Sequence, residues 1–142
     1  MLRGIPSVVS PDLMHVLLSM GHGDEIVLAD GNFPAATHAK RLVRADGHGV
    51  PEILAAIAPL FPLDAYVDDD AVVMATVEDI PEPPIWEQFR AILSGAEGEA
   101  VALTPIERHA FYARASDAFA IVATGESAVY ANLILKKGVV VE

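Results

Sequence analysis

The chain has 142 residues, of which 9 are Lys or Arg and 20 are Asp or Glu, and it contains no cysteine. A chain of this length is expected to form one domain, residues 1–142, that buries roughly 70% of its unfolded surface in a single core. The net charge of −11 argues against nucleic acid or an anionic membrane as a partner. Without cysteine, the chain has no disulfide, no thiol nucleophile and no cysteine-based metal site.

The amino-terminal residues do not follow the pattern of a secretory signal, because Arg3 is followed by glycine and proline instead of an apolar run. No apolar run approaches the roughly 18 residues that a membrane span needs. We therefore expect a cytoplasmic protein.

Signals for a first helix begin at Ser10, which can cap it, and continue with Pro11, which suits the first helical position. An apolar stripe at helical spacing follows, and Gly21 is expected to end the helix; the stripe consists of Leu13, Val16, Leu17 and Met20. Residues 25–29 are then expected to form a short buried strand because they are rich in β-branched and apolar side chains.

The remaining pattern alternates strands with helices. It predicts a loop at 30–37, a strand at 41–44, a helix from Pro51 to Pro62, a strand at 72–77, an exposed acidic loop at 78–84 and a helix over 85–93. After a possible strand at 101–103, residues 104–107 fit a capping box that would open a fourth helix. Strands at 119–123 and 133–135 follow, around a turn at Gly125. Short strands alternating with helices favour an α/β layered fold with a largely buried sheet.

The run from Met20 to Asp30 carries the first chemical signal. His22 lies between two glycines just before the strand at 25–29, and Asp30 comes directly after that strand. Ligands of open α/β sheets usually bind where strands leave the sheet, so a titratable ring and a carboxylate here form a candidate acid/base pair. The alternative is that His22 is a surface residue and that Asp30 bonds its own backbone in a turn.

Two later clusters offer further polar groups. Arg108 would lie in the first turn of the fourth helix, against the preference of the helix dipole, and local rules tend to fail at functional sites. The alternative is a solvated arginine that pairs with Glu107 or Asp117, with His109 and Tyr112 also on the surface. The run Tyr130, Ala131 and Asn132 supplies a phenol and an amide, the groups that hold sugar hydroxyls; a turn before the last strand explains it nearly as well.

Other templates do not match. The glycines fit neither nucleotide-binding fingerprint, the histidines lack the spacing of a metal site, and the Gly-x-Ser-x-Gly hydrolase motif is absent.

Several blocks in one order resemble the L-fucose mutarotase and D-ribose pyranase family over nearly the whole chain. They are 20–35, 44–47, 59–64, 111–112, 119–126 and 130–138. The resemblance is closer to the fucose branch, because the ribose branch has histidine at the position of Arg108. Ala131 departs from the glycine of many fucose mutarotases, and Asn32 from the histidine of some.

The resemblance implies a three-layer α/β/α single domain of the D-ribose pyranase type. The implied activity is an isomerase reaction that interconverts the α and β anomers of a free monosaccharide such as L-fucose, without metal or organic cofactor. By matched position, His22 would be the acid/base residue, and Asp30, Arg108, Tyr130, Ala131 and Asn132 would bind the sugar. A homo-oligomer, in some members a decameric ring, with sites near subunit contacts, is also implied. D-ribose pyranase activity and non-catalytic sugar binding are the alternatives.

Overall fold

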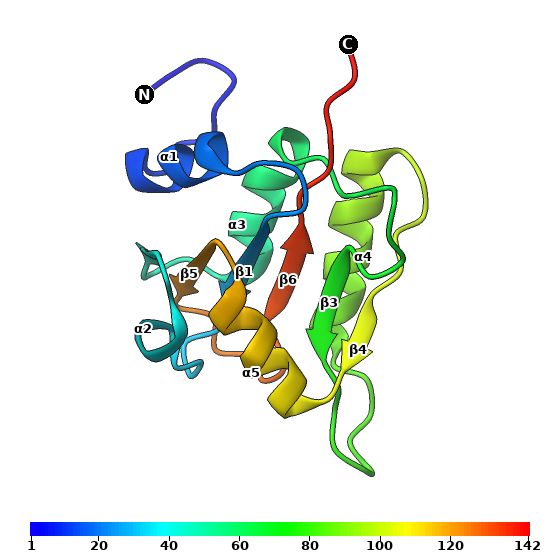
Figure 1. The fold of residues 1–142 in the computed structure, drawn as a ribbon. Coiled ribbons are helices and arrows are strands. Elements are labelled where there is room, and N and C mark those ends of the chain that lie inside the picture. The colour runs from blue at the N-terminus through cyan, green and yellow to red at the C-terminus, as the bar shows by residue number, and fades with distance from the viewer.

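Six strands form one sheet in the order β2-β5-β1-β6-β3-β4 in the computed structural model, which describes residues 1–142 (Figure 1). The strands are β1 (Glu25–Ala29), β2 (Leu42–Ala45), β3 (Ala71–Met74), β4 (Thr104–Ile106), β5 (Ala120–Thr124) and β6 (Leu133–Lys136). The helices are α1 (Pro11–Ser19), α2 (Ala35–His38), α3 (Val50–Ile57), α4 (Pro84–Glu97) and α5 (Arg108–Asp117), with a 3₁₀ turn at Ala58–Leu60 after α3.

Strand direction gives the sheet two chemically different edges. β6 runs antiparallel to its neighbours β1 and β3, whereas the other neighbouring pairs are parallel. The carboxyl ends of β1 to β5 therefore meet the amino end of β6 at one edge, which we call the carboxyl edge (bottom of Figure 1). The opposite side, where β1 begins and β6 ends, is the amino edge.

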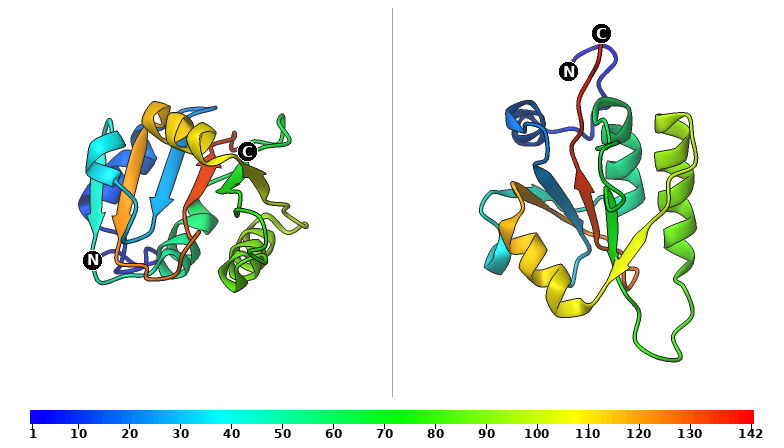
Figure 2. Two further views of the ribbon diagram at one scale, coloured as in Figure 1. Left: turned by 90° about the horizontal axis from the view of Figure 1, so that it is seen from below. Right: turned by 45° about the vertical axis from the view of Figure 1, so that its right-hand side comes forward.

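Helices cover both faces of the sheet, which confirms the predicted three-layer α/β/α arrangement (Figure 2). Successive residues of a strand point to opposite faces. Ile26 and Leu28 accordingly lie in the core cluster that includes side chains of α1, α3 and α4, whereas Val27 and Ala29 lie in the cluster with α2 and α5. All four are fully buried, as predicted for this strand.

The first helix forms as predicted. The Ser10 hydroxyl accepts a hydrogen bond from the Leu13 amide at 3.1 Å, and the apolar stripe is buried. Its end differs slightly, because Met20 is already extended and the left-handed residue is Gly23, at φ 85°. This glycine conformation lets the chain turn into β1.

Other expectations need correction. Thr104 to Ile106 form strand β4, paired with β3, and not a capping box; Glu107 caps α5 instead, through a carboxylate that accepts from the Ala110 amide at 3.1 Å. Propensity at this point is overridden by pairing along the sheet. Helix α4 continues beyond the predicted end at residue 93 and stops at the left-handed Gly98. β5 and β6 flank β1 and are not paired with each other, and the predicted loop at 30–37 runs into the short helix α2.

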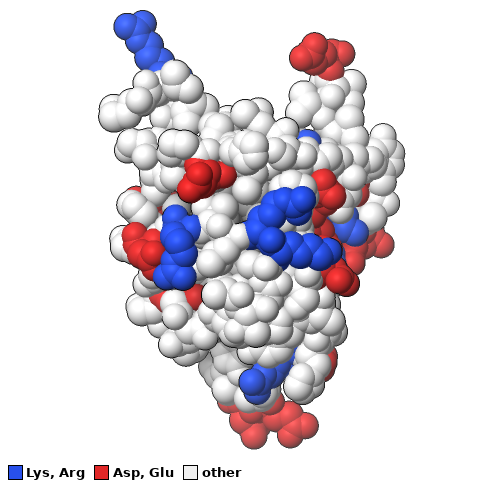
Figure 3. Space-filling view, turned by 60° about the vertical axis from the view of Figure 1, so that its left-hand side comes forward, with Lys and Arg blue, Asp and Glu red and all other residues white.

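Charged groups of both signs share the surface. In the face drawn in Figure 3, basic groups on the body of the molecule lie beside acidic ones and form no continuous basic surface. None of the helices has the length and apolar character required to cross a bilayer.

Candidate active site

A hollow of about 270 Å³ opens at the carboxyl edge, near the lower size range of small-molecule sites. It gathers residues from the ends of β1 and β3, from α5 and from the segment before β6. Its lining consists of Asp30, Asn32, Phe33, Met74, Ala75, Val77, Arg108, Tyr112, Val129, Tyr130 and Asn132. Polar groups therefore stand against an apolar wall, as a site for a small polar molecule with an apolar face requires.

Hydrogen bonds to both carboxylate oxygens fix the Asp30 side chain. Its Oδ1 accepts hydrogen bonds from the amides of Asn32 at 3.0 Å and Phe33 at 2.9 Å. Its Oδ2 accepts from the Asn132 side-chain amide at 3.2 Å. The turn-forming role considered for Asp30 is thus real, and the same carboxylate, 6% exposed, also lines the hollow. A carboxylate oxygen has two lone pairs, so Oδ2 retains an acceptor position.

The segment before β6 places Tyr130 and Asn132 in the hollow, with Ala131 between them fully buried and outside its lining. Tyr130 has φ 55°, the left-handed region that a bulky residue rarely adopts. The Trp86 indole N–H donates to the Tyr130 carbonyl at 2.9 Å and holds this backbone in place. Strained backbone held by its surroundings is characteristic of ligand sites.

Helix α5 places a positively charged side chain, that of Arg108, at the hollow. Arg108 and Tyr112 are four residues apart and therefore share a helix face, with the guanidinium carbon 5.6 Å from the centre of the Tyr112 ring. Glu107 is engaged by backbone amides, and those of His109 and Ala110 lower the pKa of its carboxyl. Neither Glu107 nor Asp117 pairs with Arg108, so its charge is available to the hollow.

Two further aromatic rings, those of His38 and Phe33, pack against Tyr112. The His38 ring stacks on Tyr112 at 5.3 Å between ring centres and 10° between planes, and Phe33 contacts Tyr112 at 5.5 Å. His38 Nδ1 lies 2.7 Å from the Ser116 hydroxyl, which fixes the imidazole to α5. Tyr112 is thereby held with little rotational freedom.

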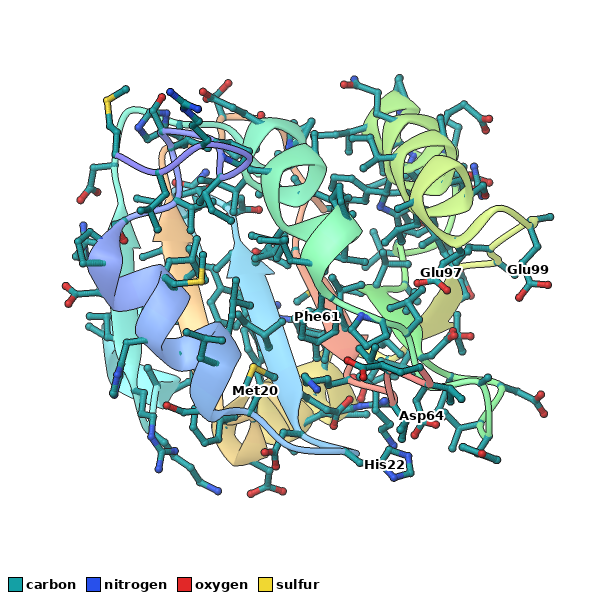
Figure 4. The ribbon with its side chains drawn as sticks, turned by 90° about the horizontal axis from the view of Figure 1, so that it is seen from above. Met20, His22, Phe61, Asp64, Glu97 and Glu99 are labelled. Carbon is teal, nitrogen blue, oxygen red and sulfur yellow. The ribbon has the colours of Figure 1, made fainter.

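His22 lies elsewhere, at the amino edge. Its Nε2 is 3.2 Å from Asp64 Oδ1, and its side chain is 49% exposed (Figure 4). The five residues of β1 separate His22 from the carboxyl edge, and a strand of that length spans about 16 Å. The acid/base pair expected of His22 and Asp30 therefore does not form within one chain, because the two residues lie beyond opposite ends of the same strand.

Of the six residues anticipated for the site, the hollow brings together Asp30, Arg108, Tyr130 and Asn132, and not His22 or Ala131. The sequence reasoning did not include the wall residues Phe33, Met74 and Tyr112 among the site residues. For Tyr112, the spacing from Arg108 was an available signal. For Met74, none existed, since the approach of β3 to this hollow depends on sheet order.

Comparison with known proteins gives consistent matches. The model of the RbsD / FucU transport protein family matches residues 3–140. The fucose mutarotases of Danio rerio and Homo sapiens are each 50% identical to the chain, over 98% and 97% of it and 94% of each relative. The crystal structure of the fucose mutarotase from Streptococcus pneumoniae in complex with L-fucose superposes with a TM-score of 0.94, at 49% identity, covering 99% of this chain and 100% of that one.

Proposed function

The chain belongs to the RbsD / FucU transport protein family, and on this premise we propose that it is an isomerase that interconverts the α and β anomers of L-fucose. Relatives at 50% identity over nearly their full length bear the name fucose mutarotase. The observation that carries the proposal is the hollow at the carboxyl edge, where a carboxylate, a guanidinium, an amide and a phenol converge from three separate parts of the chain.

The proposed reaction requires only that the site move a proton between two oxygens of the sugar. Mutarotation removes the proton of the anomeric hydroxyl and protonates the ring oxygen, so that the ring opens to the aldehyde. The carbonyl then rotates and the ring closes on its other face. Acid/base catalysis contributes typically about 10²–10⁴ in rate, and the residues around the sugar add orientation.

In this proposal Asp30 Oδ2 accepts a sugar hydroxyl, Arg108 donates to ring or hydroxyl oxygens, and Tyr130 and Asn132 complete the hydrogen bonds. The fixed position of Asp30 supports its role, since its other oxygen is already held by two backbone amides. The apolar wall suits the carbon face of the ring; Phe33 and Met74 contribute to it. Ala131 is buried and does not line the hollow. In this proposal it acts only by holding the backbone that carries Tyr130 and Asn132.

The proton carrier we propose is His22 of a neighbouring copy of the chain. Within one chain, His22 stands at the far edge, half exposed and oriented by Asp64. If the amino edge of one copy faces the carboxyl edge of the next, His22 enters the hollow from outside. Such a head-to-tail interface uses two different surfaces and closes into a ring when the rotation permits. We therefore propose a homo-oligomer, with a decameric ring as one closed form.

Saturation-exchange NMR on L-fucose tests the function. Irradiation of one anomer signal should reduce the other in proportion to protein concentration, because the catalysed exchange transfers saturation. D-ribose, observed in the same way for pyranose and furanose signals, should exchange more slowly. Faster exchange of D-ribose would assign the chain to the pyranase reaction. Binding without exchange of either sugar would make it a non-catalytic binding protein.

A further inference from the structure

Glu126 lies outside the hollow, yet it forms hydrogen bonds with three parts of the chain at the carboxyl edge. The connection from β5 to β6 has to cross the carboxyl end of β1, because β1 lies between these two strands in the sheet (Figure 1). Glu126 is near the start of this connection, four residues before Tyr130. It is therefore placed to contact the loops that follow β1 and β2 as well as its own segment.

The Glu126 carboxylate caps helix α3, although 76 residues separate it from the residue that it binds there. The capping position of α3 is occupied by Gly49, which has no side chain to accept a hydrogen bond. Glu126 Oε2 accepts instead from the Val50 amide at 3.1 Å. Val50 is fully buried in the core, so the carboxylate is bound to a fixed part of the fold. The helix dipole also favours a negative charge at this end of a helix.

Gly49 is needed here for space and not for its backbone conformation. Its φ of −83° suits any residue. A Cβ at this position, however, would lie 2.7 Å from Glu126 Oε2. The carboxylate is the movable end of a flexible side chain, so a side chain at position 49 would displace the carboxylate and leave the backbone in place.

The same carboxylate holds the segment that leads to Tyr130. Glu126 Oε1 accepts from the Ala128 amide at 3.1 Å, and the Trp86 indole donates to the Tyr130 carbonyl at 2.9 Å. These are the two hydrogen bonds made by the backbone of residues 127–131. Without the first, Tyr130 would keep its unfavourable left-handed conformation only through Trp86.

The backbone of Glu126 is bound to the strand that carries Asp30. The Gly31 amide, directly after Asp30, donates to the Glu126 carbonyl at 2.8 Å. The Glu126 amide donates to the Thr124 hydroxyl at 3.2 Å, and that hydroxyl donates to the Ala29 carbonyl at 2.7 Å. Residue 126 is thus tied to the chain on both sides of Asp30.

We propose that Glu126 is a positioning residue that sets Tyr130 relative to Asp30, because it fixes the segment carrying Tyr130 to the start of α3. The geometric part of this inference stands on contacts within one chain, and its consequence for sugar binding rests on the proposed function. A misplacement of about 1 Å can cost about a hundredfold in catalytic efficiency, so the position of the Tyr130 phenol at the hollow matters.

The position of Tyr130 can be observed without sugar and without activity. The chain has three tyrosines, so ¹⁹F NMR of protein labelled with 3-fluorotyrosine reports on each of them, and Tyr66→Phe and Tyr130→Phe variants assign the signals. Glu126→Ala should shift or broaden the Tyr130 signal and leave that of Tyr66, beside His22 at the amino edge, unchanged. An unchanged Tyr130 signal would overturn the inference. Equal changes at Tyr66 would indicate a general loss of structure and would also overturn it.

Two further variants keep the test decisive if Glu126→Ala does not fold. Glu126→Gln keeps the shape of the side chain but offers one oxygen to two backbone amides, and its NH₂ group faces the other amide. Gly49→Ala keeps the carboxylate and displaces it. Both variants should move the Tyr130 signal in the same direction, and a wild-type Tyr130 signal in both would refute the proposal.

Saturation exchange with L-fucose measures the consequence for the proposed site. In Glu126→Ala, kcat/KM should fall about tenfold, mostly through a higher KM, because Tyr130 is proposed to bind the sugar alike in the ground state and the transition state. A fall confined to kcat would count against a role in positioning a binding group. Absence of exchange in the wild type would refute the proposed function and leave the ¹⁹F result intact.

Ser10→Ala is the matched control. It removes a helix-capping hydrogen bond as well, that of α1 to the Leu13 amide, so it tests the effect of a lost cap away from the hollow. The Tyr130 signal and the KM for L-fucose should both stay at wild-type values. A changed Tyr130 signal or a raised KM in this variant would assign the effect to lost stability and count against a specific role of Glu126.

Discussion

Asp30 and Asn132 exchange two hydrogen bonds although 102 residues separate them in the chain. The Asp30 amide donates to Asn132 Oδ1 at 2.7 Å, and the Asn132 side-chain amide donates to Asp30 Oδ2 at 3.2 Å. Both residues are buried, at 6% and 5% exposure. This reciprocal pair ties the carboxyl end of β1 to the amino end of β6 and fixes one wall of the proposed sugar site.

Replacing Asn132 with alanine should therefore affect both stability and activity. The Asp30 amide and Oδ2 would lose their partners in a buried place, which costs about 1–3 kcal/mol in the free energy of unfolding. Urea unfolding would measure this loss, and saturation exchange would show slower anomer conversion. Asn32→Ala is the control: Asn32 lines the same hollow but is exposed, so stability should change by less than about 0.5 kcal/mol. Equal stability of the two variants would contradict the structural role of the pair.

Mixing two inactive variants tests whether the site spans two copies. His22→Ala and Arg108→Ala should each abolish most L-fucose exchange on their own. Unfolded together and refolded as a 1:1 mixture, roughly a quarter of the head-to-tail interfaces would hold both wild-type residues, and activity should return to about that fraction. The same variants refolded separately and then mixed serve as the control. A mixture that stays inactive while forming oligomers would show that His22 of one copy and Arg108 of the next do not share a site.

Arg108 should govern the choice of sugar. The guanidinium is unpaired within the chain and lines the hollow, so its hydrogen bonds to sugar oxygens are charge-assisted. Arg108→His should lower kcat/KM for L-fucose by about tenfold to a hundredfold, as expected for loss of a hydrogen bond to a charged group. The relative rate with D-ribose should rise. His109→Ala, one residue away and exposed, should leave both rates unchanged. An equal loss of kcat/KM for both sugars would show that Arg108 contributes to sugar binding in general and not to the choice between the two sugars.

Low pH should weaken the ion pairs by which Arg114 of α5 is bound to Glu25 of β1 and to Asp69. Arg114 donates to Glu25 Oε2 and Asp69 Oδ2, each at 2.8 Å. Burial raises the pKa of Asp69, but the hydrogen bond and charge of Arg114 outweigh it and leave the pKa below the usual 3.8. A lowered folded-state pKa means that this stabilisation is complete above the unfolded value and is lost as the pH falls through the folded one.

The unfolding free energy of the wild type should accordingly decline below about pH 5, while Arg114→Gln should be less stable at neutral pH and decline less steeply. Denaturant unfolding at a series of pH values measures both slopes. Arg90→Gln, which disrupts the pairs of Arg90 with the exposed carboxylates of Glu82 and Glu87, is the control and should keep the wild-type slope. Parallel curves for wild type and Arg114→Gln would refute this account.

Local sequence patterns were sufficient to predict most of the individual helices and strands. The residues of β1 and the buried stripe of α1 follow from the apolar pattern, because burial selects apolar residues at intervals of about two in strands and 3.6 in helices. The pattern failed at Thr104 to Ile106, where a proline and a cap-forming threonine resemble a helix start but pair with β3. The ordered family blocks predicted a set of site residues without giving their arrangement.

The sequence by itself determined the side chains that we propose for the chemistry: an imidazole between glycines, a carboxylate after a strand, an arginine on a helix and a tyrosine with an asparagine before the last strand. Only the tertiary structure decided which of them meet. Because β6 runs antiparallel beside β1, Asn132 reaches Asp30, and because β1 is extended, His22 is carried to the other edge, beside Asp64. Strand order and direction depend on contacts between distant residues, and no local periodicity encodes them.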